Sequence, residues 1–563
     1  MKKNFLKLLN VAVLSIFIVA CSNPSKMAKH ADLVKTECEP SILEVKGGKI
    51  DANYTITFPE KFFLSEAILN VTPVLLYGNG KQVVGPVLTL QGDKIMDNYN
   101  VIPYENGGTI SKNVSFDYKP GMEKATLELR AVVYNAKRSK QYKFPYGYKI
   151  ADGTICTSLL ANASGTPSFE EDNYQQVIKE TKESQILYKI NQADVRNSEL
   201  NSKGIKELQE YLKNLKGDDR RRIVSNDIIA YASPDGDYND NTKLSERRAK
   251  TAKNAFEKNI SKKADVKNIP LNVSQISEDW EGFQELVAAS DIQDKELILR
   301  VLSMYSDPAV REREIKNMSA VFQTLADEVL PALRRARFVT NVEFQNYTDE
   351  ELAKIISGSN EGIIDIDELD EEALLYGATL FENREIKEKL YKKAAKNFNS
   401  DRAYNNLATL CLQDGKYRDA KNYLEKISNK DNSFYNNMAV ICMSENDYNS
   451  AKEYLENAGE LKAAKENLGA IKILEGDYQG AAEDLKGTNS YNEALVNLLN
   501  NNLAEASSIL GDTECPKYSY LRAIIAARQG QVAEANAQLD KAKVVKELAE
   551  RSKNDIEFVK TNL

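Results

Sequence analysis

The pattern of apolar and polar positions changes twice along the chain. Between about residues 40 and 160 the apolar residues alternate with polar ones or form short runs, as β-strands do. Between residues 185 and 346 such runs take turns with stretches of helical periodicity, and from residue 373 onward the periodicity is helical throughout. The pattern therefore predicts a multidomain protein with a β-rich N-terminal part, a central α/β module and an all-α C-terminal part.

The N-terminal region contains several short strands at regular spacing. Runs such as Val71–Tyr77, Val83–Leu90 and Ala125–Tyr134 are separated by glycine-rich segments that are typical of turns. This arrangement predicts a β-sandwich of immunoglobulin-like kind over residues 38–165. Its edge strands are suited to pairing with a partner strand, and a packed spacer domain is the alternative interpretation.

The central region alternates strands with amphipathic helices. We expect helices over residues 200–215 and 241–258, a longer helical stretch over residues 283–326, and four strands, over residues 186–190, 223–232, 269–276 and 338–344. After this region, residues 347–372 are polar and acidic. The acidic run Asp365-Ile366-Asp367-Glu368-Leu369-Asp370 near their end lacks the glycine that a calcium-binding loop needs for its sharp turn, so a linker or a solvated helix is expected there.

The C-terminal region repeats itself. An aromatic or aliphatic residue followed three positions later by alanine recurs at 417, 448, 478, 503 and 532, with separations of 31, 30, 25 and 29 residues. Upstream of the first three stand Asn406-Leu407-Ala408, Asn437-Met438-Ala439 and Asn467-Leu468-Gly469. The spacing predicts paired helices with small residues where the helices meet, and the pattern resembles the tetratricopeptide repeat over residues 373–563. Stacked helix pairs of this kind leave a curved open face, which we expect to bind a protein partner.

The first 21 residues indicate export. Lysines at 2, 3 and 7 precede a short apolar run, and Ile18-Val19-Ala20-Cys21 resembles the lipobox of bacterial lipoproteins. The resemblance implies cleavage after residue 20, acylation of Cys21 and anchoring in the outer membrane of a Gram-negative bacterium. We expect residues 21–37 to be the lipidated cysteine and a polar linker, and the body of the protein to lie in the periplasm.

Composition excludes several classes of function. Removing the three leader lysines leaves 72 basic and 83 acidic residues, a net charge of −11, so we expect no nucleic-acid partner. The single histidine, His30, argues against histidine-based hydrolase triads and metal sites. We therefore expect no enzymatic activity, cofactor or metal. Cys38 and Cys156 bracket the β-rich region and are a candidate disulfide pair in an oxidising compartment.

The most specific motif lies in the α/β region, where residues 241–249 read Asn-Thr-Lys-Leu-Ser-Glu-Arg-Arg-Ala. On a helix, Asn241, Leu244 and Arg248 share one side. The Arg248 guanidinium can reach the preceding loop and bind a carboxylate with two parallel hydrogen bonds. The loop that precedes the helix, from Ser233 to Tyr238, adds the positive potential of main-chain N–H groups and of a helix N-terminus.

This motif resembles the peptidoglycan-binding domain of the OmpA C-terminal family over residues 185–346, as found in Bacteroidetes-type outer-membrane lipoproteins. The resemblance implies that Arg248 binds the diaminopimelate carboxylate of the cell-wall stem peptide, with Asn241 and Leu244 shaping the pocket. The family's usual loop aspartate is replaced by Ser233, and Asp235 lies two residues later. Either Asp235 substitutes for it, or the module keeps the fold with Arg248 paired to Glu246 or Asp235.

Two functions therefore remain open. In the first, a lipoprotein binds peptidoglycan through the central module and a protein partner through the repeats, as a tether or scaffold. In the second, it is a scaffold subunit of a cell-surface or secretion assembly whose central module does not bind the wall. An enzyme acting on glycan or peptide has little support, because the chain contains no glycine-rich phosphate loop and no nucleophile elbow.

Overall fold

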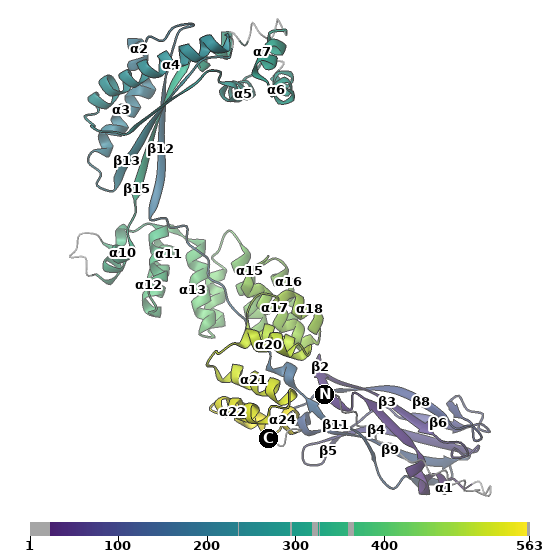
Figure 1. Ribbon diagram of the computed structural model, residues 1–563. Helices are drawn as coiled ribbons and strands as arrows, with labels where there is room; N and C mark the ends of the chain where they lie inside the picture. The colour runs from purple at the N-terminus through teal and green to yellow at the C-terminus, as the bar shows by residue number, and fades with distance from the viewer. Residues whose placement is uncertain are drawn as a thin grey trace. The chain divides into compact units, whose positions relative to one another are not determined.

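The computed structural model describes residues 23–234, 236–292, 295–317, 325, 327–358 and 365–559 (Figure 1). The predicted leader (residues 1–20), Cys21 and Asp235 lie outside the described residues. The chain forms two compact units, one of residues 1–170 with 399–563 and the other of residues 171–398. Among the described helices, none combines the length and the apolar character needed to cross a membrane.

The N-terminal part is one curled β-sheet. The strands joined in its main path run in the order β1 (Lys35–Glu39), β3 (Lys49–Phe58), β2 (Ile42–Lys46), β11 (Tyr148–Ile155), β9 (Thr126–Asn135), β4 (Ala67–Tyr77), β6 (Leu88–Gly92) and β7 (Asn100–Ile102). Three further strands join its sides: β8 (Gly108–Asp117) on β3, β5 (Lys81–Val84) on β4 and β10 (Gln141–Lys143) on β9.

Strand β2 explains why the sheet is continuous. It pairs antiparallel with β3 and parallel with β11, so the two halves of the predicted sandwich are hydrogen-bonded into one path. Alternate residues of β3, from Ile50 to Phe58, are buried in a single core shared by both halves. The β-rich region is thus as expected, but it is a single curled sheet rather than two separate ones.

Most of the predicted linker at residues 21–37 is folded. Residues Ser25–Lys29 form helix α1, which packs against β9 and β10, and the Met27 side chain is buried in the core of the sheet. Strand β1 then begins at Lys35. The polar composition hid this packing, because one methionine and two alanines supply the buried face.

The C-terminal part confirms the five predicted helix pairs. They are α13 (Asp401–Gln413) with α14 (Tyr417–Leu424), α15 (Asn432–Ser444) with α16 (Tyr448–Glu456), α17 (Lys462–Glu475) with α18 (Tyr478–Leu485), α19 (Tyr491–Leu499) with α20 (Leu503–Leu510), and α21 (Pro516–Arg528) with α22 (Val532–Ala542). Each second helix begins at the predicted aromatic or aliphatic residue, and the alanine three positions later is fully buried in every pair. Helices α23 (Lys546–Ser552) and α24 (Ile556–Val559) follow.

The second unit contains a four-stranded mixed sheet. Its order is β12 (Val177–Leu187), β15 (Arg335–Gln345), β13 (Arg221–Tyr231) and β14 (Leu271–Ile276), with only the β13–β14 pair parallel. Helices α3 (Lys203–Leu215) and α4 (Tyr238–Ala255) lie along this sheet (Figure 1). Both cover the face that carries Ile228 and Phe338, and the predicted apolar side of α3, from Ile205 to Leu215, is buried there.

The predicted long helical stretch is divided. Its described residues include α5 (Trp280–Ala289), α6 (Lys295–Met304) and α7 (Pro308–Asn317), and the short α9 (Leu330–Leu333) follows it. These segments have a core of their own, built around Phe283, Leu302 and Leu333.

The predicted acidic linker at residues 347–372 also contains packed structure. Residues Asp349–Ser357 form α10, which starts with a capping box between Thr348 and Glu351. Its apolar side, including Ile356, is buried near α11 (Glu371–Thr379), where a Cβ on Gly377 would come within 2.6 Å of Ile356. Helix α12 (Arg384–Phe398) completes this unit, so the predicted repeat region at 373–563 divides at residue 399.

Candidate functional site

The predicted carboxylate-binding arginine is an interior residue. Arg248 lies on α4, whose N-terminus is capped by Asp237, and only 1% of its surface is exposed. The guanidinium extends to the end of β13 and to residues 189–192. Its donors, however, bind main-chain carbonyl groups of the protein itself.

Between described residues, the Arg248 side chain donates hydrogen bonds to three main-chain carbonyls. Nε donates to the Gln192 carbonyl at 3.0 Å, and the two terminal nitrogens donate to the Tyr231 and Lys189 carbonyls at 2.8 and 3.2 Å. The guanidinium carbon lies 5.0 Å from the centre of the Tyr188 ring, a cation–π distance. Burial raises the pKa of the Tyr188 hydroxyl to about 12. Arg248 therefore joins the end of β13 to the segment that follows β12.

Two other predicted site residues, Ser233 and Asn241, lie at the loop that precedes α4. Asn241 Nδ2 donates to the carbonyls of Ser233 and Gly236, both at 3.1 Å, and so holds the loop closed over the start of α4. The Ser233 hydroxyl accepts a hydrogen bond from Arg334 Nε at 3.4 Å. Ser233, Asn241 and Leu244 are each at least nine-tenths buried. The structure thus brings the predicted residues together, but as part of the packing of α4 on the sheet.

A second set of polar contacts lies on the helix pairs. The sequence analysis did not predict it. Residues 160–170, which we call the strap, lead away from the β-rich part and run in an extended conformation along the first helices of four successive pairs. Each of these helices contributes one asparagine, and together the four form an asparagine ladder: Asn406, Asn437, Asn467 and Asn492.

Every asparagine of the ladder binds both main-chain groups of one strap residue. Oδ1 accepts from the N–H and Nδ2 donates to the carbonyl, with the N–H distance given first in each case: Asn492 to Asn162 at 2.8 and 3.0 Å, Asn467 to Thr166 at 2.6 and 3.0 Å, Asn437 to Ser168 at 2.8 and 2.9 Å, and Asn406 to Glu170 at 2.7 and 3.0 Å. A carboxamide is the side chain that offers a donor and an acceptor side by side. Recognition by these four residues involves the main chain only.

Neighbouring polar residues complete the ladder. Asn436 Nδ2 donates to the Thr166 carbonyl at 3.0 Å, and Asn405 Nδ2 and Thr409 Oγ1 donate to the Ser168 carbonyl at 3.1 and 2.6 Å. Asn405, Asn436 and Thr409 are fully buried. Because buried amides and hydroxyls are costly without partners, the strap satisfies groups that would otherwise face an empty groove.

The register of the strap follows the repeat spacing. The ladder residues 406, 437 and 467 are 31 and 30 positions apart, and they bind strap residues two positions apart. The interval from Asn467 to Asn492 is only 25 residues, and there the strap advances by four. Gly165 lies in this interval with φ +83°, where a Cβ would come within 2.8 Å of Val440.

The strap ends beside a group of carboxylates. Burial, followed by a hydrogen bond with Asp431, raises the pKa of Glu170 to about 8. Asp401 raises this pKa further, whereas Arg402 lowers it. At neutral pH the Glu170 side chain is therefore mainly protonated.

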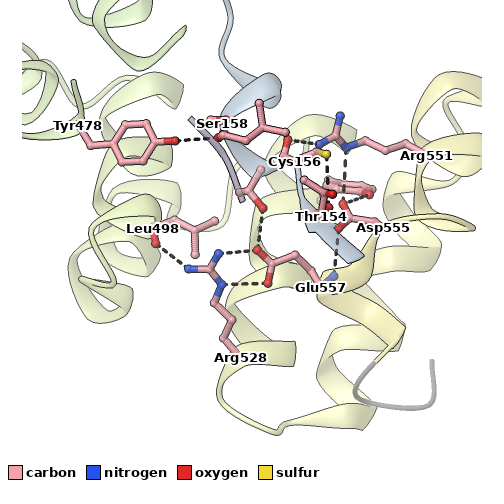
Figure 2. Close-up of polar contacts among 12 residues, drawn as sticks. Thr154, Cys156, Ser158, Tyr478, Leu498, Arg528, Arg551, Asp555 and Glu557 are labelled. Atoms are coloured by element: carbon pink, nitrogen blue, oxygen red, sulfur yellow. Dashed lines mark hydrogen bonds and ion pairs between the residues drawn. The ribbon is translucent and has the colours of Figure 1, made fainter. Parts of the chain in front are cut away.

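A third polar group joins the β-sheet to the last helices (Figure 2). Arg528 Nε donates to Glu557 at 3.0 Å and Nη1 donates to the Leu498 carbonyl at 2.9 Å, while Thr157 donates to the same carboxylate at 2.7 Å. Arg551 donates to the Cys156 carbonyl, and Tyr520 donates to Asp555 at 2.8 Å. These contacts fix the C-terminal helices to the end of β11.

The predicted disulfide between Cys38 and Cys156 is not formed. Cys38 and Cys156 are both free thiols: Cys38 lies on β1 opposite Tyr54, and Cys156 follows β11, where its thiol donates to the Thr154 carbonyl. Burial raises the pKa of the Cys156 thiol to about 12. Among the described residues, no three His, Cys, Asp or Glu side chains are grouped in a way that would bind a metal.

Two comparisons with known proteins found no match. No protein-family model matches the sequence, and no curated protein is detectably similar to it. The sequence did contain a signal for the asparagine ladder: an asparagine recurs at one position of the repeated helices, and Asn406, Asn437 and Asn467 were part of the repeat pattern. Their partner, a small-residue segment more than 200 positions away in sequence, left no such signal.

Proposed function

We propose that the chain is a lipid-anchored envelope protein that works as a scaffold, with an OmpA-like central module that does not bind the cell wall. The observation that carries this choice is the burial of Arg248 and the use of its guanidinium by three main-chain carbonyls. A wall carboxylate entering this site would have to displace internal hydrogen bonds of a charged donor, each worth about 1.5–3 kcal/mol.

The anchor belongs to the same proposal. The basic start, the short apolar run and Cys21 support lipidation at the outer membrane, with the body in the periplasm. A lipoprotein with more than one acyl chain is held firmly, whereas a single chain anchors only marginally. The four-stranded sheet with helices on one face is compatible with the OmpA-like interpretation, and the five helix pairs are compatible with tetratricopeptide-like repeats.

The scaffold role rests on the helix pairs. Stacked pairs bury a continuous core and expose long surfaces, and such surfaces suit protein partners better than small substrates. The acidic net charge and the single histidine favour a binding role over hydrolysis or nucleic-acid recognition.

Sedimentation with purified peptidoglycan tests the proposal. The full chain with Cys21→Ser is expected to stay in the supernatant, and titration with meso-diaminopimelate is expected to leave the fluorescence of Trp280, the only tryptophan, unchanged. Wall binding that is lost in Arg248→Lys and kept in Arg247→Ala, an exposed neighbour on α4, would overturn the proposal in favour of a peptidoglycan tether.

Two cellular measurements test the remaining parts. Incorporation of labelled palmitate and recovery in the outer-membrane fraction should both be lost in Cys21→Ser. Crosslinking from exposed positions on the helix pairs should recover a specific protein partner, and recovery of none would contradict the scaffold role.

A further inference from the structure

We propose that the asparagine ladder is a sequence-independent clamp for extended polypeptide, and that the strap is a built-in ligand which keeps the clamp occupied until another extended segment replaces it. This inference deepens the proposed function, because it names the kind of partner that the helix pairs accept and the device that controls access.

The contacts define what the clamp recognises. Eight hydrogen bonds connect the four ladder asparagines to N–H and carbonyl groups of the strap, and none of the eight involves a strap side chain. Main-chain groups are common to all non-proline residues, so any segment able to lie extended in the same register presents the same donors and acceptors.

The strap sequence is suited to filling the clamp without adding strong side-chain specificity. It reads Leu-Ala-Asn-Ala-Ser-Gly-Thr-Pro-Ser-Phe-Glu, with small residues at most positions. Pro167 lies between Thr166 and Ser168, whose N–H groups are bound, so the missing N–H of proline falls at a position the ladder does not use. Side-chain contacts exist beside these: Thr166 Oγ1 donates to Glu466 at 3.2 Å, the Ser168 hydroxyl accepts from Asn436 Nδ2 at 3.1 Å, and Glu170 is hydrogen-bonded to Asp431.

Two features favour exchange over a permanent structural role. From residue 161 to residue 170 the strap forms neither helix nor strand; apart from its contacts with the helix pairs it is a simple connection. The groups it satisfies, including the fully buried Asn405 and Asn436, would be satisfied equally by the main chain of another segment. Exchange therefore need not leave buried polar groups unpaired.

Covalent attachment makes the strap a strong competitor. A ligand joined by a short flexible connection has an effective concentration in the millimolar range. A free peptide with the same intrinsic affinity as the strap, if that affinity is tighter than millimolar, would therefore show an apparent Kd of about 1 mM against the unmodified chain. Weakening the strap is expected to reveal that intrinsic affinity.

The test uses a fluorescent peptide with the sequence of residues 160–171 and the full chain carrying Cys21→Ser. In the strap-release variant, Thr166→Pro with Ser168→Pro removes the two N–H groups that Asn467 and Asn437 accept. We expect this variant to bind the peptide at least tenfold more tightly than the unmodified chain. Adding Asn437→Ala and Asn467→Ala should abolish the gain, whereas adding Asn449→Ala, an exposed asparagine on α16, should not.

Two further peptides test the chemistry of recognition. A peptide with permuted side chains that keeps glycine and proline in place should bind within a few-fold of the original. A peptide with proline at the positions of 166 and 168 should not bind. Equal binding of both, or binding that survives loss of the ladder asparagines, would overturn the proposal.

Hydrogen exchange on the unmodified chain provides a measurement that does not depend on any variant folding. The N–H groups of Thr166 and Ser168 should exchange faster than the buried helical N–H groups of α15 and α17, because the strap opens while the helix pairs stay folded. Exchange of both sets only at the rate of global unfolding would show that the strap is a permanent part of the core. These experiments involve neither membrane nor cell wall, so their outcome is independent of Cys21 and Arg248.

Discussion

Asn437 lies opposite Ser168 so that one side-chain amide binds both main-chain groups of that residue, at 2.8 Å for the N–H and 2.9 Å for the carbonyl. The same amide nitrogen also lies within hydrogen-bonding distance of Asn405 and Thr409. Asn437 is therefore both a member of the asparagine ladder and the centre of a buried polar network. Networks of this kind rigidify a site when every member is satisfied.

Asn437→Ala should destabilise the helix pairs by about 2–4 kcal/mol, because it leaves buried groups of Ser168 and Asn405 without partners. Urea-induced unfolding followed by far-ultraviolet circular dichroism measures the change. Asn449→Ala, on the exposed side of α16, is the matched control and should stay within about 0.5 kcal/mol of the unmodified chain. A similar loss in both variants would contradict a special role for the ladder.

Gly165→Ala should weaken the strap for two separable reasons. A non-glycine residue at φ +83° costs roughly 1–2 kcal/mol, and the added Cβ would lie 2.8 Å from Val440 Cγ1. Adding Val440→Ala should recover the steric part only. A double-mutant cycle on unfolding free energies measures the coupling, and the absence of any coupling would show that the strap does not lie against α15.

Arg248→Ala should destabilise the central module by at least about 3 kcal/mol, since three carbonyls lose a charged donor inside the protein. The fluorescence of Trp280, which begins α5 in the same unit, reports on this module. Arg247→Ala is the control, because its side chain is exposed on the same helix, and it should have little effect. Stability that is unchanged in Arg248→Ala would contradict the interior role of this arginine.

The strap should respond to pH through Glu170, whose pKa is raised to about 8. A carboxyl with a raised pKa in the folded state stabilises that state fully below its ordinary pKa, near 4.3, and the contribution disappears as the pH rises through 8. Unfolding free energies of the unmodified chain and of Glu170→Gln, which mimics the neutral carboxyl, should therefore be closest at pH 5 and diverge toward pH 9, as the unmodified chain loses stability. A constant difference between the two across this range would show that the carboxyl does not titrate in the fold.

Glu557→Ala should destabilise the attachment of the last helices by about 3–5 kcal/mol, because it leaves the partly buried Arg528 without its carboxylate. The double variant with Arg528→Met removes the unpaired charge and should recover much of the loss. Thermal unfolding is the measurement. No recovery in the double variant would indicate that the Thr157 contact with Glu557, rather than the ion pair, holds this junction.

The predictions that succeeded share one property, which is that they rest on local periodicity. The five helix pairs follow from an aromatic-to-alanine spacing that a helix must present on one face, and Ala420 and Ala451 are buried for that reason. Three strands of the central sheet likewise follow from apolar runs, whereas the first, β12, covers Val177–Leu187 and meets the predicted strand over residues 186–190 only at its end. The predictions that failed, such as the unpacked linkers around Met27 and Ile356, concerned short segments whose few apolar residues find their partners elsewhere in the chain.

The sequence alone therefore determined the order of the three regions, the register of the helix pairs and the placement of Arg248 on the same side of its helix as Asn241 and Leu244, because each depends on neighbours within one turn or one strand. Only the tertiary structure decided what Arg248 binds and what lies against the asparagine ladder. Both depend on main-chain groups, of the loop at 189–192 and of the strap at 160–170, and every residue carries these groups alike. Nothing in the side-chain sequence distinguishes the segments that use them.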